Sequence, residues 1–380
     1  MKRFSGMAMM AMFNIRISGP RTERGSGVTG DPRPTRGPLL RDVAERAGVA
    51  TGTVSNVLHT PDKVAPDTLA RVQAVIAEMG YVPNAAARQL SRGRSGSVGL
   101  LVLDARNPFF NDLAAGVEDA AGQMDLAVLL ATSSERADRE RMYLDRFEQS
   151  RVDGLLVTPV GGSDKQLRAI RDRGTPIVLL DRLATTPGFS SVAVDDIEGG
   201  RLAGQHLVDV GCRSIAFVGG PMTLEQVRNR LAGAGRAAEA AGVPFTHIAT
   251  TRMAADEGRR VGFEIAAMPP SERPDGVFGA NDLVALAILQ ALLLAGIRVP
   301  EDVAVIGYDD IDFAALAGVP LSSIRQPSYQ MGRRAMELLA VAMADGEEAQ
   351  AASRQVVFMP ELAARASTGR GAALIPRSPG

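Results

Sequence analysis

Two regions of the chain differ in the spacing of their apolar residues. Between residues 39 and 90, apolar positions recur three and four residues apart, which predicts short amphipathic helices. From residue 96 onward, short apolar runs alternate with amphipathic segments of helical length, which predicts strands that alternate with helices. We therefore expect a small all-α domain followed by a larger α/β body.

The first region predicts two short helices joined by a turn at Ala47-Gly48-Val49. Two helices that meet at a short glycine-containing turn are typical of a helix-turn-helix. A third helix is expected over 66–79, because Pro66 suits a first helical turn, and a short helical stretch follows at 84–90. The inner faces of the first two helices consist of Leu40, Val43, Ala44, Ala47, Val54, Val57 and Leu58.

The outer face of the second helix, over 51–58, carries small polar side chains. A helix with such a face can lie close to the base edges in the major groove of DNA. The DNA contacts expected from this face and the end of the helix are Thr51, Gly52, Thr53, Ser55, Asn56 and His59.

In the second region, the apolar runs are short and almost continuous, as in parallel sheets that helices cover on both faces. The length allows two such sheets, with the chain crossing between them near residue 195 and near residues 310–325. Ligands of doubly wound sheets bind outside the carboxyl ends of the strands, so polar residues that follow strands are candidate ligand contacts. The expected strands are 98–103, 127–131, 154–158, 177–180, 192–194, 215–218, 276–278 and 303–306.

Polar residues follow several of these strands, and Arg230 lies separately on the helical segment 224–241. Carboxylates, an amide and a guanidinium at one cleft can hydrogen-bond neighbouring hydroxyls, while an aromatic ring packs on an apolar ring face. This combination favours a sugar or another small polar ring. The alternative for any single Asp or Asn is a turn or a helix cap. We expect Asp195 and Asp196 to cap a helix that starts at Ile197, with lining of the cleft as their alternative role.

The charge of the chain does not indicate a non-specific nucleic-acid coat, because the formal net charge is −1. Residues 37–92 carry six Lys or Arg and five Asp or Glu, a net charge of +1. One such domain should bind DNA weakly, and useful affinity would need two.

Cys212 is the only cysteine, so no intrachain disulfide can form, which is compatible with a reducing cytoplasm. The richest apolar run, 283–297, is broken by Gln290 and is short for a membrane span. We expect a buried core helix there and no membrane partner.

The two ends of the chain differ from the rest in composition. Residues 1–36 carry seven Lys or Arg against two Asp or Glu, and 19–38 are dense in Gly, Pro, Arg and Thr, which predicts a disordered extension. We interpret the extension as dispensable; the alternative is a basic arm that touches phosphate. The tail, 369–380, is rich in Gly and Pro and has no heptad pattern for a tetramerising helix, which predicts a flexible tail and a dimer.

Three phrases of the first region occur in register: D-V-A-x-x-A-G-V at 42–49, T-V-S-x-V-L at 53–58 and G-Y-V-P-N-x-x-A-R-x-L at 80–90. Together they resemble the DNA-binding headpiece of the lactose-repressor/galactose-repressor (LacI/GalR) family of bacterial transcription regulators. Phrases of the body, among them G-L-L-V-L-D-x-x-N-P-F-F at 99–110 and V-P-E-D-V-A-V-I-G-Y-D-D at 299–310, resemble the family's periplasmic-binding-protein-like effector domain.

The resemblance covers roughly residues 39–368 and implies an α/β fold class. An N-terminal all-α helix-turn-helix headpiece is followed by a body of two subdomains, each a parallel sheet flanked by helices. The expected domains are a helix-turn-helix DNA-binding domain at 37–83, a hinge helix and linker at 84–95 and an effector-binding and dimerisation domain at 96–368. The resemblance also implies DNA contacts from Ala87, Arg88 and Leu90, with Leu90 wedging a base step in the minor groove.

The function that the resemblance implies is that of a homodimeric, cytoplasmic repressor whose heads read a pseudo-palindromic operator in double-stranded DNA. A small polar effector, most simply a sugar, would bind between the subdomains and change the affinity for the operator. No cofactor and no metal are implied, and His206 is expected to be structural. The effector contacts carried over by resemblance are Phe109, Phe110, Asp181, Arg230, Asn281 and Asp309.

Several positions of the head depart from the family's pattern. Ala50 stands where the family commonly has Ser, whose hydroxyl could cap the helix or touch phosphate, and Thr51 can substitute for it. Gly52 offers no side chain for base choice, while Asn56 and His59 stand where Arg and Asn are frequent. Because Asn can read adenine and Arg favours guanine, we expect an operator that differs from the usual family half-site.

Besides a family member that acts as an activator or uses a protein as its effector, two other functions fit parts of the chain. An exported solute-binding protein of a sugar transporter would share the body, but residues 39–90 would then have no purpose. An enzyme is not indicated, because the sequence has no phosphate-binding G-x-x-x-x-G-K-[ST] loop and no G-x-G-x-x-G after a strand. Its histidines, His59, His206 and His247, lie in no metal-ligand spacing and beside no G-x-S-x-G nucleophile elbow.

Overall fold

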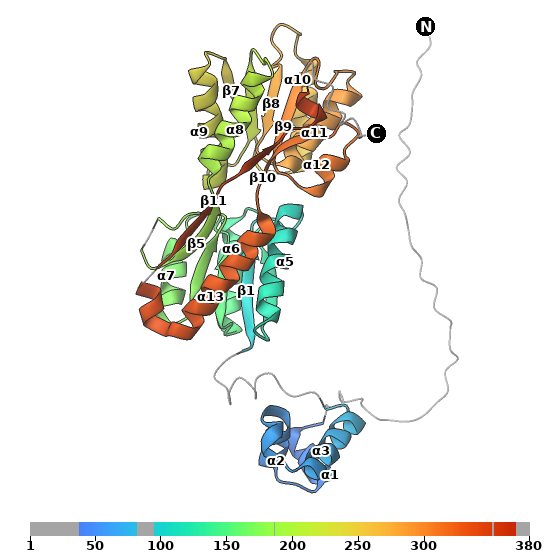
Figure 1. Cartoon of the computed structure of the whole chain (residues 1–380), viewed down its shortest axis with the longest axis vertical. Helices are drawn as coiled ribbons and strands as arrows, with labels where there is room; N and C mark the ends of the chain where they lie inside the picture. The colour runs from blue at the N-terminus through green and yellow to red at the C-terminus, as the bar shows by residue number, and fades with distance from the viewer. Residues whose placement is uncertain (1–37, 82–94, 186, 352, 370–380) are drawn as a thin grey trace, which may run out of the picture. The chain divides into compact units, whose positions relative to one another are not determined.

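The computed structural model describes residues 38–81, 95–185, 187–351 and 353–369 (Figure 1). The chain divides after Pro83 into two compact units, which we call the head and the body and describe separately. The expectations for residues 1–36, for the hinge helix at 84–90 and for the tail beyond residue 369 lie outside the described residues.

The head is a group of helices around one small core. Gly48 ends the first helix with φ +66°, the left-handed conformation that glycine adopts without strain. Val43, Val54 and Val72 contribute one fully buried side chain from each of the three α-helices. The predicted helix-turn-helix is therefore present, and the third helix has the predicted bounds. The elements are α1 (Leu40–Ala47), α2 (Thr51–His59), the 3-10 turn η1 (Pro61–Lys63) and α3 (Pro66–Met79).

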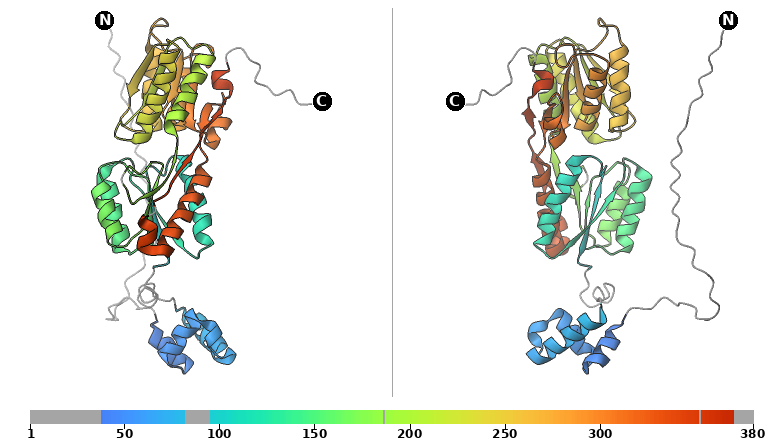
Figure 2. Two further views of the ribbon diagram at one scale, coloured as in Figure 1. Left: turned by 60° about the vertical axis from the view of Figure 1, so that its left-hand side comes forward. Right: turned by 90° about the vertical axis from the view of Figure 1, so that its right-hand side faces the viewer.

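The first lobe of the body is a parallel sheet in the order β11-β5-β4-β3-β1-β2, with helices on both faces (Figure 2). Successive strand residues point to opposite faces. Leu100 and Leu156 therefore join the core beneath α5 and α13, while Leu101 and Leu155 join a separate core beneath α6 and α7. The strands are β1 (Ser97–Val102), β2 (Ala127–Thr132), β3 (Gly154–Val157), β4 (Ile177–Leu180), β5 (Ser190–Val194) and β11 (Gln355–Phe358), and the helices are α5 (Pro108–Gly122), α6 (Ala137–Gln149), α7 (Asp164–Asp172) and α13 (Ser328–Ala351).

The second lobe repeats this plan in the order β12-β10-β9-β8-β6-β7. Only β12, among the described strands, runs antiparallel to its neighbour. Helices α8 and α9 form one helical layer, and α10 and α11 form another (Figure 1). The architecture confirms the predicted fold class. The strands are β6 (Ile215–Gly219), β7 (Phe245–Ala249), β8 (Gly276–Gly279), β9 (Ala304–Asp309), β10 (Ser322–Arg325) and β12 (Glu361–Ala363), and the helices are α8 (Asp196–Asp209), α9 (Glu225–Ala240), α10 (Ala255–Ala267), α11 (Asp282–Leu294), α12 (Asp312–Leu316) and the 3-10 turn η2 (Ala366–Thr368).

The body chain crosses between the lobes at three places in its described part. The first crossing is at Asp195, between β5 and α8. The second is at 326–327, between β10 and α13, directly after the predicted range of 310–325, whose last residues, 322–325, form a strand of the second sheet. The third, at 359–360 between β11 and β12, was not predicted.

Four strands have no clear apolar run in the sequence. Strands β7, β11 and β12 lie at sheet edges, where fewer residues are buried, and their residues are half-buried or exposed. Strand β10 is buried but contains two serines. Ser322 Oγ lies 2.7 Å from Thr368 Oγ1, and Ser323 Oγ donates to Asp282 Oδ1 at 2.6 Å. These hydrogen bonds let polar side chains occupy a buried strand.

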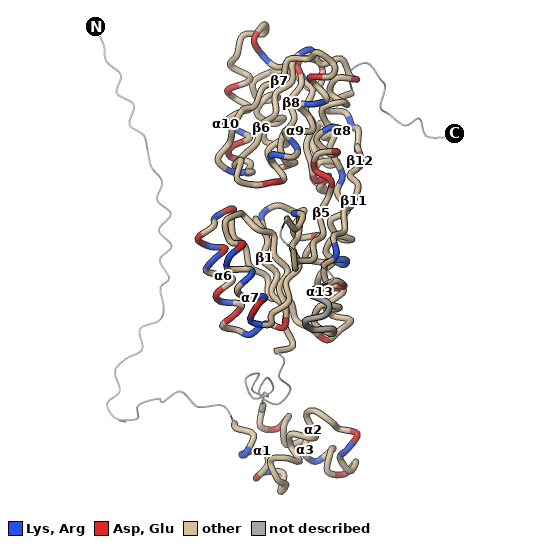
Figure 3. Tube along the Cα trace, turned by 90° about the vertical axis from the view of Figure 1, so that its left-hand side faces the viewer, with Lys and Arg blue, Asp and Glu red and all other residues tan. Residues whose placement is uncertain are grey.

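The surface of the first lobe carries both signs of charge. Acidic and basic residues are interspersed along α6 and α7 (Figure 3). The apolar run of the sequence forms α11, which is largely buried as predicted, although Leu293 and Leu294 at its end are exposed. Within the described ranges, no helix is both long enough and apolar enough to cross a bilayer.

Candidate functional sites

The outer face of α2 is open to solvent, as the helical pattern predicts. Val54 and Val57 hold the opposite face of the helix in the core of the head. Because the helical period fixes which side chains point outward, the predicted polar side chains share the open face. The exposed or half-buried residues there are Thr51, Gly52, Thr53, Ser55, Asn56 and His59.

The first turn of α2 has no side-chain cap. Ala50 is the N-cap residue, and Thr51 is already inside the helix, so its hydroxyl does not take over the capping role. The amide groups at the start of α2 therefore receive no acceptor from a capping side chain. Such groups can donate to an anion, and a DNA phosphate is one.

Arg230, on α9, is the centre of a buried polar network in the body. Its guanidinium donates from Nε to Asp196 Oδ1 and from Nη1 to the carbonyl oxygen of Ala280, each at 2.8 Å. The guanidinium carbon lies 3.7 Å from the centroid of the Tyr308 ring, and Nη1 lies 3.9 Å from Asp309 Oδ1. Burial acts to lower the pKa of Arg230, but the surrounding acidic groups keep that pKa above its ordinary value. Arg230 therefore stays charged.

Two glycines bring α9 close enough to α8 for this ion pair. A Cβ atom on Gly200 would lie 2.2 Å from the carbonyl oxygen of Arg230, and one on Gly233 would lie 2.0 Å from that of Ile197. Both distances are too short for any other residue type, because a side-chain carbon cannot approach backbone oxygen so closely. Gly200 and Gly233 thus position Arg230.

The start of α8 corrects one prediction. The helix begins at Asp196 and not at Ile197, and Asp195 alone is its N-cap, accepting from the Glu198 amide at 2.9 Å. Asp196 does not cap the helix; its carboxylate faces Arg230.

Asp309 joins the two lobes at the carboxyl end of β9. Its φ of +112° lies in a region that residues other than glycine rarely occupy, and such strain is concentrated at functional sites. Its carboxylate accepts from Asn107 Nδ2, in the first lobe, and from Gln326 Nε2, at the second crossing, both at 2.8 Å. Burial, which outweighs these hydrogen bonds, raises the pKa of Asp309 to about 6.

Asp181 holds a second connection between the lobes at the carboxyl end of β4. Its Oδ2 accepts from Gln226 Nε2 of α9 at 2.9 Å, whereas its Oδ1 is buried without a hydrogen-bond partner among the described residues. Burial and the neighbouring carboxylate of Asp196 raise the pKa of Asp181 to about 8. At neutral pH most of the Asp181 side chain is therefore a neutral acid that can donate a hydrogen bond.

A cavity of about 290 Å³ adjoins Asp181 and Gln226. Both lobes line it, and the ion pair between Arg182 Nε and Glu225 Oε2, 3.2 Å apart, crosses it from one lobe to the other. Its volume is near the lower end of the range of roughly 300–1,000 Å³ that small-molecule sites occupy. The space suits a small ligand that offers several hydroxyl groups.

The structure brings some of the predicted effector contacts together and keeps others apart. Arg230 and Asp309 belong to one buried network, and Asp181, which is hydrogen-bonded to Gln226, lies close enough for its charge to interact with theirs. Asn281 is the N-cap of α11: it accepts from the Val284 amide at 2.9 Å and donates to the Met253 carbonyl at 3.2 Å, within its own lobe. The rings of Phe109 and Phe110 pack edge to face in the core of the first lobe, with centroids 5.0 Å apart.

Sequence reasoning did not assign the hydrogen-bond partners of these carboxylates. Asn107 follows a predicted strand, so its position carried a signal. Gln226 and Gln326 carried none, since one lies on a helix and the other follows a strand that the pattern missed. His206 Nε2 lies 2.7 Å from Thr368 Oγ1, away from this network, as expected for a structural residue.

Both parts of the chain match known families. Residues 39–84 match the family model of bacterial regulatory proteins, lacI family, and residues 204–368 match that of a periplasmic binding protein-like domain. The ribose operon repressor of Bacillus subtilis (strain 168) is 36% identical over 300 residues, which span 79% of this chain and 90% of that protein.

Two solved structures extend the similarity over head and body. A complex of the transcriptional regulator CelR with cellobiose is 32% identical with a TM-score of 0.62, covering 87% of this chain and 99% of that one. The lac repressor dimer bound to operator and the anti-inducer ONPF is 27% identical with a TM-score of 0.74, covering 88% and 99%. These proteins are named as regulators and not as enzymes, and they favour a regulator over an exported solute-binding protein.

Proposed function

Because this chain belongs to the lacI family of bacterial regulatory proteins, we propose that it is a homodimeric transcriptional repressor controlled by a small polar effector, a sugar. One observation carries the proposal: the same chain holds a helix-turn-helix head with an open polar face and a two-lobed body with a buried polar network at its strand ends. Such a repressor acts in the cytoplasm, where its operator lies.

On the DNA side, α2 enters the major groove and its open face contacts the bases. Asn56 is exposed, and Gly52 has no neighbouring atom within 4 Å of the position that a Cβ atom would take. Base choice at these positions therefore differs from that of relatives with larger side chains. Ala87, Arg88 and Leu90, proposed for the hinge helix, lie outside the described residues.

On the effector side, the ligand binds between the lobes, against Asp181, Arg230 and Asp309. A charged donor, a neutral acid and a carboxylate can together bind neighbouring hydroxyl groups. Of these three residues, Asp181 lines the small cavity between the lobes. Two relatives carry sugars in their names, ribose and cellobiose. Phe109, Phe110 and Asn281 remain proposed effector contacts, although they lie apart from this network.

The dimer places two heads on the two halves of a pseudo-palindrome. The small head with its net charge of +1 needs this second contact for affinity. Phe313 and Leu316, three residues apart on α12, are 59% and 78% exposed, and a second copy of the chain is the proposed cover for this apolar face. Effector binding changes the operator affinity only through different affinities for the two states of the body.

The first test is an in-vitro selection of bound duplexes from a random DNA library, with residues 37–380 and with or without a panel of sugars. Recovery of a pseudo-palindrome is the expected result. A sugar that abolishes or enhances recovery identifies the effector and the sign of control. No enrichment under any condition would contradict the repressor function.

The hinge proposal has its own test, Leu90→Ala. Removal of the wedge should greatly weaken binding to the selected operator in a mobility-shift assay, because the bend in DNA loses its support. Affinity for the sugar, measured by calorimetry, should stay nearly the same. If both affinities are unchanged, Leu90 does not act at the operator.

A further inference from the structure

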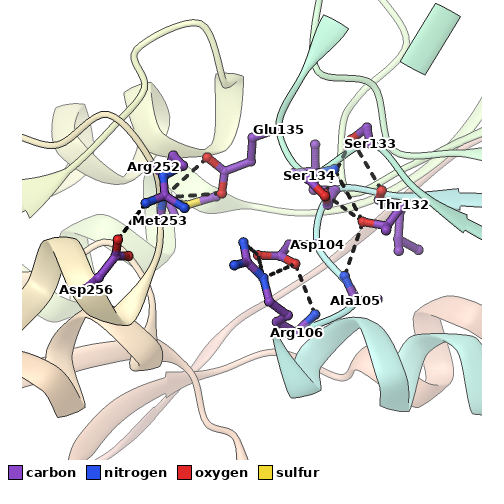
Figure 4. A network of polar contacts seen from close by, with 12 residues as sticks. Asp104, Ala105, Arg106, Thr132, Ser133, Ser134, Glu135, Arg252, Met253 and Asp256 are labelled. Atoms are coloured by element: carbon purple, nitrogen blue, oxygen red, sulfur yellow. Dashed lines mark hydrogen bonds and ion pairs between the residues drawn. The ribbon is translucent and has the colours of Figure 1, made fainter. Parts of the chain in front are cut away.

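Glu135 connects the two lobes at a place that the effector network does not use. Both of its carboxylate oxygens face the backbone amide of Met253, at 3.2 and 3.3 Å (Figure 4). Glu135 lies in the loop between β2 and α6 of the first lobe, and Met253 lies in the loop between β7 and α10 of the second. The contact is therefore a bridge across the cleft.

The position of this bridge makes it sensitive to opening. Strands β2 and β7 are the last strands of their sheets, whereas β11 and β12, joined by the third crossing, are the first strands. A rotation of the lobes about the crossings separates atoms in proportion to their distance from the axis. In both sheets, the bridge lies at the edge farthest from β11 and β12, so even a small opening of the lobes breaks it.

The loop that carries Glu135 is held in place before any contact with the second lobe. Ser134 and Glu135 have φ values of +50° and +58°, which residues other than glycine adopt only when their surroundings hold them. Thr132 Oγ1 accepts from the amides of Ser134 and Ala105, both at 3.3 Å (Figure 4). The Glu135 amide donates to the Leu103 carbonyl at 3.2 Å. This loop presents the carboxyl group as a fixed element of the first lobe.

We propose that Glu135 is a latch that couples closure of the cleft to the uptake of one proton, which makes effector binding depend on pH in the neutral range. The proposal rests on the proposed function only where it concerns the effector. Closure itself is a property of the two lobes and of this contact.

The charges that face Glu135 come from both lobes. Asp104 and Arg106, after β1, form an ion pair at 2.7 Å, and Arg252 and Asp256, before and in α10, form another at 2.6 Å (Figure 4). Burial in the closed form, opposed by the Met253 hydrogen bond and reinforced by Asp104, raises the pKa of Glu135 to about 7. Arg252 and Arg106 act in the opposite direction but do not cancel the effect.

The sign of the coupling follows from this shift. In the open form the carboxyl group faces water and its pKa is that of an ordinary glutamate, 4.5. Because closure raises the pKa, the closed form binds the proton more tightly and gains population as the pH falls from 8 toward 5. A rise from 4.5 to about 7 increases the closure constant about tenfold between pH 8 and pH 6.

The test compares the wild-type full chain with Glu135→Gln at pH 6 and pH 8. Glutamine keeps an oxygen that accepts from Met253 but has no charge to bury. Hydrogen exchange at the Met253 amide, expressed as protection relative to the intrinsic rate, reports the bridge directly. The matched control is Asp138→Asn on the same segment, since Asp138 is exposed and pairs with Arg136 of its own lobe.

We expect the protection of Met253 to rise about tenfold from pH 8 to pH 6 in the wild type and in Asp138→Asn, and to be equal at both pH values in Glu135→Gln. An equal pH dependence in the wild type and Glu135→Gln would show that another group takes up the proton. Weaker protection in Glu135→Gln at both pH values would show that the bridge needs the charge, which overturns proton uptake.

A second arm titrates D-ribose into the same proteins by calorimetry. For each protein, we take the ratio of the ribose affinity at pH 6 to that at pH 8. This ratio should be about ten times larger for the wild type than for Glu135→Gln. Asp181 and Asp309 titrate in both proteins, so their effects cancel in the comparison. If ribose does not bind, the sugar proposal fails for that ligand, and amide exchange still decides the latch.

Discussion

At the scale of single residues, the body buries the charged guanidinium group of Arg230, at a cost in solvation free energy. Arg230 is 3% exposed and depends on Asp196 and Asp309 for compensation. A buried ion pair adds little net stability, but removal of one member leaves the other uncompensated. Charges and strained backbone collected at one place are typical of a binding site.

The first prediction concerns Arg230→Ala. The substitution should lower the free energy of unfolding of the body by about 3–5 kcal/mol, because Asp196 and Asp309 lose their buried partner. Arg201→Ala is the matched control: Arg201 pairs with Glu198 on the surface of α8, and its loss should cost about 0.5 kcal/mol or less. Urea unfolding followed by circular dichroism measures the free energy of unfolding of both variants. An equal loss of stability in the two would show that the buried ion pair contributes no more than the surface pair.

At the scale of elements, glycines have opposite roles within the helix-turn-helix. Gly48 has φ +66° and ends α1, so the turn to α2 requires it. Gly52 lies in the interior of α2 with open space around its Cβ position, so the fold does not require it. The proposed contact of α2 with DNA would explain a glycine at this position, which weakens the helix.

We therefore predict opposite outcomes for the same change at two positions of the head. Gly52→Ala should stabilise the head by up to about 1 kcal/mol and alter the selected operator, because the new methyl group faces the bases. Gly48→Ala should destabilise the head by about 1–2 kcal/mol through its left-handed backbone. Protection of the slowest amides of α3 gives both free energies; a destabilised Gly52→Ala would mean that its Cβ position is not open.

A second pair of glycines tests the approach of α9 to α8. Gly233→Ala must separate the two helices and displace Arg230, with an expected loss of about 1–3 kcal/mol and weaker effector binding. Two residues further along α9, Gly235→Ala places its Cβ 3.4 Å from the Phe245 ring, which is an ordinary contact. Thermal unfolding and calorimetry should therefore separate the two variants, and similar behaviour would argue against close packing as the cause.

At the scale of the whole molecule, the lobes are built from segments far apart in the chain. Strand β11 joins the first sheet although it follows five of the six strands of the second sheet in the chain, and α13 packs on α5. Three crossings connect the described lobes, so a relative movement of the lobes would be a rotation about these crossings. In the proposed mechanism, the dimer transmits such a movement to two heads.

The dimer provides the fourth prediction. Leu316→Arg places a charge on the apolar face of α12 and should convert the dimer to monomers in sedimentation experiments. Binding to a full pseudo-palindrome should fall far more than binding to a half-site, because only the former needs two heads. Val341→Arg, at a 41% exposed position on α13, is the control and should remain dimeric. A dimeric Leu316→Arg protein would locate the interface elsewhere.

The sequence by itself determined the elements with a strong local pattern. The bounds of α3, the turn at Gly48 and the buried strand β4 follow from apolar spacing and from residues with special backbone conformations. These signals depend on residues that are close together in the sequence, so they can be recognised without knowledge of the tertiary structure. The phrases of the head and body likewise identified the family.

Only the tertiary structure decided which polar groups meet. The bond from Asn107 to Asp309 spans 202 positions, and that from Met253 to Glu135 spans 118. Likewise, β11 and β12 are too short and too exposed to show a pattern, and sheet neighbours alone make them strands. A polar side chain looks the same in the sequence whether it caps a helix or closes a cleft, because its partner is chosen by the path of the chain and by burial.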